Sequence, residues 1–315
     1  MSGEARTGLV FAERDTGPLV MDVVLPPATG GRRPVVLWLH GGGWFTGDRT
    51  MAPDLTRYFA ARGITMATAE YRLSGQALFP AQLHDVRAAV RYLRRNADWL
   101  GLDPGAIGLW GSSAGGHLAA LAALTGHIAA LPDEPDAGDG PDTRVRAVSE
   151  GYGPVDLELV IAEAQQVIPA LSGANAPEAR LLGGLPDRLP ERAKQASPLS
   201  YVTSEAPPFL IAHGTADELV RPKQSVLLHE ALAAAGVEST LYLVDDFRHG
   251  FLNPAGTVEV DGPKVMDDGR LETEPEPPAT RHHSAPGMRH TERTTFSFDT
   301  IGEFFQRHLQ QGDNR

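Results

Sequence analysis

Residues 107–124 read IGLWGSSAGGHLAALAAL, and this stretch decides the fold, because an apolar strand passes directly into a helix. The pentapeptide at the junction, 111–115, fits G-x-S-x-G with Ser113 at its centre. A sharp strand-to-helix turn needs a glycine on each side of the serine and leaves the serine Oγ exposed above the sheet edge. We expect Ser112, at the x position, to point away. The placement predicts a nucleophile rather than a glycine-rich turn without chemistry.

Working outward, short apolar runs alternate with helical patterns along the chain. The runs typical of buried strands are 35–39, 64–71, 107–110, 145–149, 209–212 and 240–244. Helical spacing of apolar residues follows Pro80, extends over 223–235 and returns in the last residues of the chain. This alternation predicts an α/β fold, with a mostly parallel sheet and helices on both of its faces. Residues 9–13 and 19–25 predict an antiparallel hairpin at the sheet edge.

Two stretches interrupt the alternation without dividing the chain, so we expect a single domain over 1–315. Residues 151–207 contain helical patches between two strands, and this length predicts a small cap over the sheet. Residues 253–295 are rich in proline and charge, which is typical of a long, weakly structured insertion before the last helix.

A second glycine-rich stretch, HGGGW at 40–44, follows the predicted strand 35–39. Consecutive glycines let backbone amides approach a substrate closely, and acyl transfer needs such donors where charge develops on the carbonyl oxygen. We therefore predict an oxyanion hole made by the amides of Gly42, Gly43 and Ala114. The alternative is a phosphate-binding loop. It lacks support, because the chain has no G-x-x-x-x-G-K-[ST] sequence.

A serine nucleophile needs a histidine to take its proton and a carboxylate to orient that histidine. Asp217 comes after the predicted strand 209–212, and His249 comes after 240–244. We predict that these two residues complete a triad with the serine, and Glu218 is the alternative acid. Three further histidines in the same motifs are expected to support loops or pack in the core: His40, His117 and His213.

The composition narrows the possible classes of function. The 315 residues carry a net charge of −12, which disfavours nucleic acid and anionic membranes as partners. The absence of cysteine excludes disulfides and thiol chemistry. No apolar run reaches the roughly 18 residues that span a bilayer, and no signal peptide is evident, so we expect a cytoplasmic protein. We expect no metal or other cofactor, because the acidic and histidine residues near the C-terminus lack ligand spacing. These residues are Asp267, Asp268, His282, His283 and His290.

Several motifs together carry a resemblance to a known family. They are HGGGW at 40–44, YRLS at 71–74, FPAQ at 79–82, WGSSAGGH at 110–117 and HGTAD at 213–217. With these motifs the chain resembles the α/β-hydrolase carboxylesterases, in particular the feruloyl/acetyl-xylan esterase-like (BD-FAE-like) group near the hormone-sensitive-lipase-type esterases. The resemblance implies hydrolysis of carboxylic esters through an acyl-enzyme without a cofactor. It also implies that Ser113, Asp217 and His249 form the catalytic triad.

The same residues leave other functions open. An amide-cleaving relative, such as a kynurenine-formamidase-like enzyme or a peptidase, would carry the same triad. So would an acyl-transfer or ring-forming enzyme of secondary metabolism, and a non-catalytic binding scaffold is a third class. For an esterase, the candidate pocket residues are Trp44, Phe45 and Tyr71, and Trp44 next to the predicted hole favours short acyl groups of acetyl to butyryl size. The expected partner is a small-molecule ester, and both a monomer and a homodimer fit the sequence.

Overall fold

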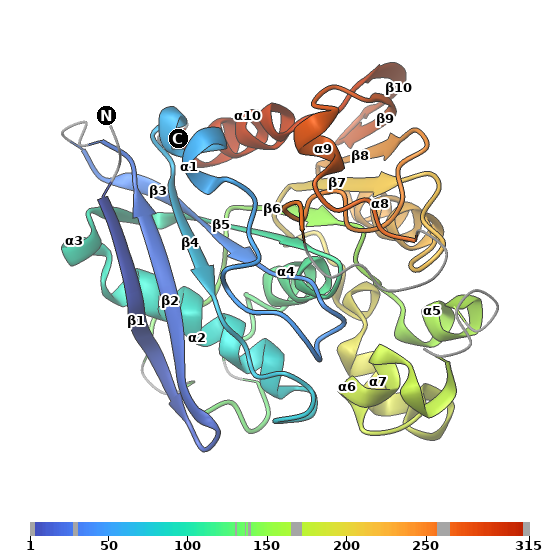
Figure 1. The fold of residues 1–315 in the computed structure, drawn as a ribbon, viewed down its shortest axis with the longest axis horizontal. Helices are drawn as coiled ribbons and strands as arrows, with labels where there is room; N and C mark the ends of the chain where they lie inside the picture. The colour runs from blue at the N-terminus through green and yellow to red at the C-terminus, as the bar shows by residue number, and fades with distance from the viewer. Residues whose placement is uncertain are drawn as a thin grey trace.

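A ten-stranded mixed sheet organises the part of the chain that the structure describes (Figure 1). This computed structural model describes residues 4–27, 31–129, 131–135, 137, 140–164, 172–256 and 265–310. The strands are β1 (Glu4–Arg14), β2 (Gly17–Leu25), β3 (Arg33–Leu39), β4 (Thr65–Ala69), β5 (Leu102–Ser112), β6 (Ala147–Gly151), β7 (Phe209–Gly214), β8 (Ser239–Val244), β9 (Pro278–Ala285) and β10 (Met288–Thr295). Their order in the sheet is β1-β2-β4-β3-β5-β6-β7-β8-β9-β10. The strands from β4 to β8 in this order are parallel, which confirms the predicted α/β fold.

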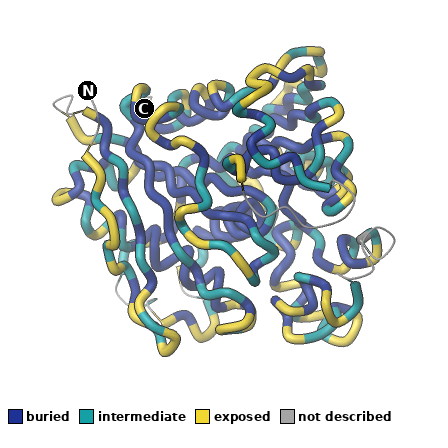
Figure 2. Tube along the Cα trace, in the orientation of Figure 1, coloured by how far each residue is buried: buried dark blue, intermediate teal, exposed yellow. Residues whose placement is uncertain are grey.

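Strand β3 shows why the central strands are continuous apolar runs. Val35 and Leu37 belong to the hydrophobic core on one face of the sheet, whereas Val36 and Trp38 belong to the core on the other face. Successive side chains of a strand point to opposite faces, so a strand that is covered on both sides needs apolar residues at every position. The dark blue centre of Figure 2 shows this burial.

Helices cover both faces of the sheet. On one face, α2, α4 and α8 contribute to the core, and α1 and α10 cover the other face. The bounds are α1 (Leu55–Tyr58), α2 (Ala81–Arg95), α3 (Ala97–Leu100), α4 (Ala114–Leu124), α8 (Lys223–Ala234), α9 (Arg270–Thr273) and α10 (Phe298–Leu309), with the short 3-10 helix η1 (Ala60–Arg62). Among the described residues, no helix has the length and apolar character that crossing a membrane requires.

Antiparallel hairpins form both edges of the sheet. At the first edge, β1 pairs with β2, which confirms the predicted hairpin. At the other edge, β9 pairs with β8 and β10, and the turn Pro286–Gly287 joins the two strands of the hairpin. The prediction of a weakly structured insertion over 253–295 is therefore wrong for these strands, while 257–264 lies outside the described residues. Strand β10 is an edge strand with mostly exposed side chains, so its charged sequence fits a strand there.

Short helices fill the segment between β6 and β7, where the sequence suggested a cap. They are α5 (Leu157–Ala164), η3 (Gly173–Asn175), α6 (Pro177–Leu182), η4 (Pro186–Arg188), α7 (Pro190–Ala196) and η5 (Pro198–Tyr201). Figure 1 shows α5, α6 and α7 together at the lower right of the molecule. Residues 165–171 of this segment lie outside the described residues.

Candidate active site

Ser113 lies in a strained turn between β5 and α4. Its φ of 53° and ψ of −121° belong to a conformation that non-glycine residues rarely adopt and that costs about 1–3 kcal/mol. The flanking glycines are required by close backbone contacts. A Cβ on Gly111 would lie 2.3 Å from the carbonyl oxygen of Gly115, and a Cβ on Gly115 would lie 2.0 Å from the carbonyl oxygen of Leu39. The pentapeptide therefore turns the chain within one residue and leaves Ser113 partly exposed.

The structure brings the three predicted triad side chains together. His249 Nε2 lies 2.8 Å from Ser113 Oγ, and His249 Nδ1 lies 2.6 Å from Asp217 Oδ2. The three residues follow β5, β7 and β8. Because the strands from β5 to β8 are parallel, their C-terminal ends all lie at the same end of the strands. His249 Nδ1–H donates a hydrogen bond to the Asp217 carboxylate, so the Nε2 lone pair of His249 faces the serine hydroxyl.

The Asp217 carboxylate is fixed on both of its oxygens. Oδ1 accepts hydrogen bonds from the amides of Leu219 (2.9 Å) and Val220 (3.0 Å), and Oδ2 also lies 3.3 Å from His213 Nε2. Burial alone would raise the pKa of Asp217, but the adjacent His249 and the hydrogen bond from His213 hold it well below its usual range. The group is therefore ionised at neutral pH. Glu218, the alternative acid, is exposed at the surface.

The glycine loop at 41–43 packs against the nucleophile turn. A Cβ on Gly41 would lie 3.3 Å from the Cβ of Ser113, so nothing larger than glycine fits there without a shift. Gly42 and Gly43 have φ angles of 103° and 56°, in the region that favours glycine. Within the described residues, the amides of Gly42, Gly43 and Ala114 donate no hydrogen bond to another protein group. The three predicted donors are therefore free to bind an oxyanion.

Trp44 and Tyr71 lie beneath this loop rather than in a substrate pocket, which corrects the prediction for both rings. Trp44 is 2% exposed, and its Nε1 donates to His117 Nδ1 over 3.2 Å. Tyr71 is 3% exposed, and its hydroxyl donates to the carbonyl oxygen of His40 over 2.9 Å. Burial lowers the pKa of His40 and His117 to about 4, so both rings are neutral at pH 7. All four side chains support the loop from the core.

Phe45 remains a candidate for the pocket wall. Its ring is half-buried, and its Cε1 lies 2.7 Å from where a Cβ on Gly43 would be. Helix α6 closes the same place, because Pro177 Cβ lies 3.1 Å from that position and the Arg180 guanidinium lies 4.8 Å from the centre of the Phe45 ring. The space on the Cα side of Gly43 is therefore narrow.

Two residues that hold His249 were not predicted from the sequence. The Tyr152 ring lies 4.8 Å from the His249 ring, and Tyr152 has a positive φ of 43°. The amide of Asp267 donates to the carbonyl oxygen of His249 over 2.7 Å, and its carboxylate accepts from the amide of Arg248 over 2.8 Å. In the sequence, the glycines on both sides of Tyr152, directly after a predicted strand, could have indicated that Tyr152 belongs to the site. Asp267 lies in the segment that was expected to be weakly structured.

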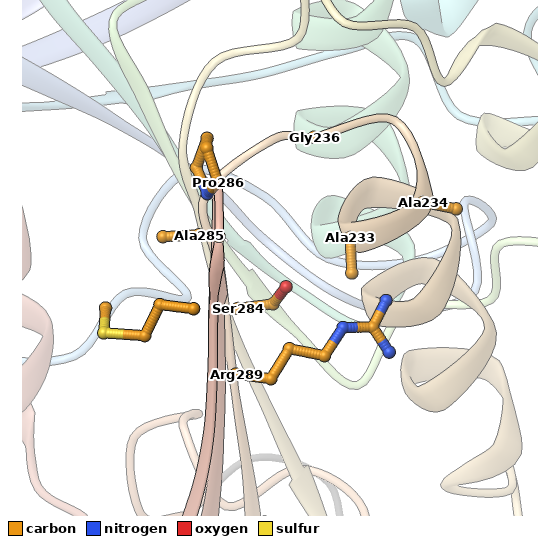
Figure 3. A pocket seen from close by; sticks show the side chains of 9 residues that line it. Ala233, Ala234, Gly236, Ser284, Ala285, Pro286 and Arg289 are labelled. Atoms are coloured by element: carbon orange, nitrogen blue, oxygen red, sulfur yellow. The ribbon is translucent and has the colours of Figure 1, made fainter.

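A surface pocket of about 320 Å³ lies beside the start of β8, at the opposite end of that strand from His249 (Figure 3). It is formed by the end of α8 and by the β9–β10 turn, and Ser284 and Arg289 line it. Ser284 pairs with Ser239 at the start of β8, whereas His249 follows the end of β8. The pocket is therefore about the length of β8 away from His249 and does not belong to the candidate active site.

The sheet order, and the succession of serine, aspartate and histidine after β5, β7 and β8, define an α/β hydrolase with a serine nucleophile. Residues 21–232 match the BD-FAE family, and the chain belongs to that family. Its fold is similar to a truncated carbohydrate esterase from gut microbiota, with 30% identity, a TM-score of 0.68, and coverage of 78% of this chain and 89% of that chain.

Other similar proteins are also esterases by name. Esterase LipQ of Mycobacterium tuberculosis is 35% identical over 73% of this chain and 53% of its own length. A thermophilic esterase from Thermogutta terrifontis, solved with propionate bound, is 26% identical with a TM-score of 0.64, and the match covers 81% of this chain and 88% of that chain. The chain spans about half the length of the curated relatives it matches first.

Proposed function

We propose that this chain is a serine esterase that hydrolyses carboxylic esters through an acyl-enzyme. The observation that carries the proposal is the continuous series of short hydrogen bonds from Ser113 through His249 to Asp217, at 2.8 and 2.6 Å. A hydroxyl becomes nucleophilic when a neutral imidazole accepts its proton, and a buried carboxylate stabilises the imidazolium that forms. The esterase names of the relatives support the same chemistry.

In the first half of the reaction, Ser113 Oγ attacks the ester carbonyl carbon while its proton moves to His249 Nε2. The negative charge that develops on the carbonyl oxygen is stabilised by the amides of Gly42, Gly43 and Ala114. The tetrahedral intermediate then collapses, and His249 gives the proton to the departing alcohol oxygen. The product of this half is an acyl ester of Ser113.

In the second half, a water molecule replaces the alcohol. His249 Nε2 takes a proton from this water, whose oxygen attacks the acyl carbon, and the same amides bind the oxyanion again. Collapse of the second intermediate breaks the bond to Ser113 and returns the proton to its Oγ. Transfer to a nucleophile other than water would use the same steps, so product analysis distinguishes hydrolysis from acyl transfer.

For the substrate, we propose a short acyl group of acetyl to butyryl size. Phe45 and Pro177 narrow the space at Gly43, whereas the Trp44 ring is buried and does not limit the acyl group. A relative that binds propionate supports the same size. Each methylene that fails to fit should lose about 1 kcal/mol in the transition state. Acetylated or feruloylated carbohydrates are candidate natural substrates, because a similar structure is a carbohydrate esterase.

Kinetics with p-nitrophenyl esters from acetate to decanoate test this proposal. We expect kcat/KM to be highest between two and four acyl carbons. A maximum at eight carbons or more would contradict the proposed size while leaving the esterase intact. Parallel assays with acetylated xylan, a feruloyl ester and formyl-kynurenine separate carbohydrate esters from the amide-cleaving alternative. A protein that hydrolyses none of these substrates would contradict the esterase proposal.

A further inference from the structure

The side chain of Ser112 points into the protein and forms a hydrogen bond that the ester-cleaving steps do not use. Ser112 is fully buried at the end of β5, and its hydroxyl donates to Asn253 Oδ1 over 3.0 Å. Asn253 is itself 6% exposed and lies four residues after His249 in the sequence. The residue that precedes the nucleophile is therefore hydrogen-bonded to the loop that carries the histidine.

The same asparagine is bonded on its other side to a later segment of the chain. Asn253 Nδ2 donates to Asp268 Oδ1 over 2.8 Å, and the amide of Gly269 donates to the carbonyl oxygen of Asn253 over 2.9 Å. The amide of Asp267, in this segment, also donates to the carbonyl oxygen of His249. Asn253 thus lies between the nucleophile strand and the segment that holds the histidine backbone.

The chemistry of these partners fixes the orientation of the Asn253 amide. A carboxylate only accepts hydrogen bonds, so the NH2 group must face Asp268. The amide oxygen then faces Ser112, whose hydroxyl donates the bond. One side chain therefore uses both of its polar groups to join two parts of the chain, and no aliphatic side chain can replace it.

Asn253 and His249 belong to one tight turn, which transmits a movement of the asparagine to the histidine. The amide of Asn253 donates to the carbonyl oxygen of Gly250 over 2.8 Å, and Gly250 has a φ of 86°. The amide of Leu252 donates to Tyr152 Oη over 3.0 Å, so the turn also rests on the residue whose ring contacts His249. The distance from the histidine ring to the nucleophile therefore depends on how firmly this turn is held.

We propose that Asn253 is a positioning residue, which holds the histidine loop at the correct distance from the nucleophile through its hydrogen bonds to Ser112 and Asp268. This inference rests on the proposed esterase function, whose triad Asn253 serves. Without these two bonds the loop loses the connection to β5 that lies behind the nucleophile. The His249 ring can then shift away from Ser113, and proton transfer needs the two groups within hydrogen-bond reach.

Asn253→Leu removes both bonds while nearly conserving the volume of the side chain. We expect kcat for p-nitrophenyl acetate to fall about 10- to 100-fold, since a displacement of roughly 1 Å at the reacting atoms can cost about 10²-fold. We expect KM to change less than about twofold, because the role concerns proton transfer rather than substrate binding. The rate at which a fluorophosphonate labels Ser113 should fall with kcat, since labelling needs the same activated serine.

A swap of the two polar side chains separates the hydrogen bond from simple packing. Asn253→Asp places two carboxylates opposite each other, and at about pH 8.5 we expect kcat to fall about tenfold or more. Adding Asp268→Asn supplies an NH2 group on the other side, so the bond between the two positions forms again in the reverse direction, while the new carboxylate still accepts from Ser112. The double variant should recover kcat about fivefold or more over Asn253→Asp, which is the effect of one hydrogen bond.

Asn96→Leu is the matched control. Asn96 Nδ2 donates to the carbonyl oxygen of Tyr92 over 2.9 Å at the end of α2, near the start of β5 and therefore at the opposite end of that strand from Ser113. This variant also loses a hydrogen bond, so its urea midpoint should fall. Its kcat and its labelling rate should stay within about twofold of the wild type, because distant sites act independently.

Three results would overturn the inference. They are an Asn253→Leu enzyme with the kcat of the wild type, a loss confined to KM, and a double variant no more active than Asn253→Asp. If Asn253→Leu does not fold, the swap still decides. Failure of the proposed function is a separate result, because a wild type that hydrolyses no ester but is labelled at Ser113 still shows, through the labelling rates of the variants, whether Asn253 positions His249.

Discussion

Replacing Asp217 with asparagine should trap His249 in an unproductive tautomer. The side-chain oxygen of Asn can stay on the amides of Leu219 and Val220, where Asp217 Oδ1 accepts bonds of 2.9 and 3.0 Å. The new NH2 group then faces His249 Nδ1, which must become an acceptor. Its proton moves to Nε2, and the ring can no longer take a proton from Ser113.

The size of the fall in kcat follows from the hydrogen bonds that break when the new side-chain amide turns to hold His249 in its productive tautomer. Turning the amide places its NH2 group against two backbone donors and leaves both of them without an acceptor, which costs about 1–3 kcal/mol each. The resulting penalty of about 2–6 kcal/mol corresponds to a roughly 30- to 10⁴-fold fall in kcat. The assay is p-nitrophenyl acetate hydrolysis, with circular dichroism to confirm folding and Glu218→Gln as the exposed control. An Asp217→Asn enzyme within tenfold of the wild type, or a Glu218→Gln enzyme with the larger loss, would refute the reasoning.

Other substitutions test the remaining parts of the site. Ser113→Ala should lower kcat about 10⁴- to 10⁶-fold with the fold intact, and a fluorophosphonate should label Ser113, as peptide mass mapping can check. Gly115→Ala should abolish soluble, folded protein, because its Cβ would lie 2.0 Å from a backbone oxygen, whereas Gly31→Ala has open space and should unfold at the wild-type urea midpoint. Burial raises the pKa of Glu178 to about 7, so its contribution to stability is present at low pH and lost as pH rises through 7. Glu178→Gln should therefore raise the free energy of unfolding at pH 8.5, by up to about 3 kcal/mol, and change it little at pH 4, and equal effects at both pH values would contradict this.

The triad could be predicted because each member follows a short apolar strand, and parallel strands bring their ends to one edge. The order of the elements and the type of residue after each strand are enough for this prediction. The position of the Trp44 ring could not be predicted in the same way, because a ring next to a glycine turn can lie on either side of the loop. In the structure the Trp44 backbone has a positive φ of 59°, and its ring lies in the core.

The hairpin of β9 and β10 was missed for a different reason. An edge strand exposes much of its surface, so its residues need not be apolar, and the composition of β10 is that of a solvated loop. The Pro286–Gly287 turn between two threonine-containing stretches was the available signal.

The position of that hairpin turn has a practical consequence for attaching the protein to a solid support. Met288, beside the turn, is 52% exposed. The turn lies near the start of β8, whereas Ser113 lies at the C-terminal ends of the parallel strands. The chain has no cysteine, so Met288→Cys would introduce a unique thiol. A maleimide surface would then hold every molecule by the same point, with Ser113 directed into the solution.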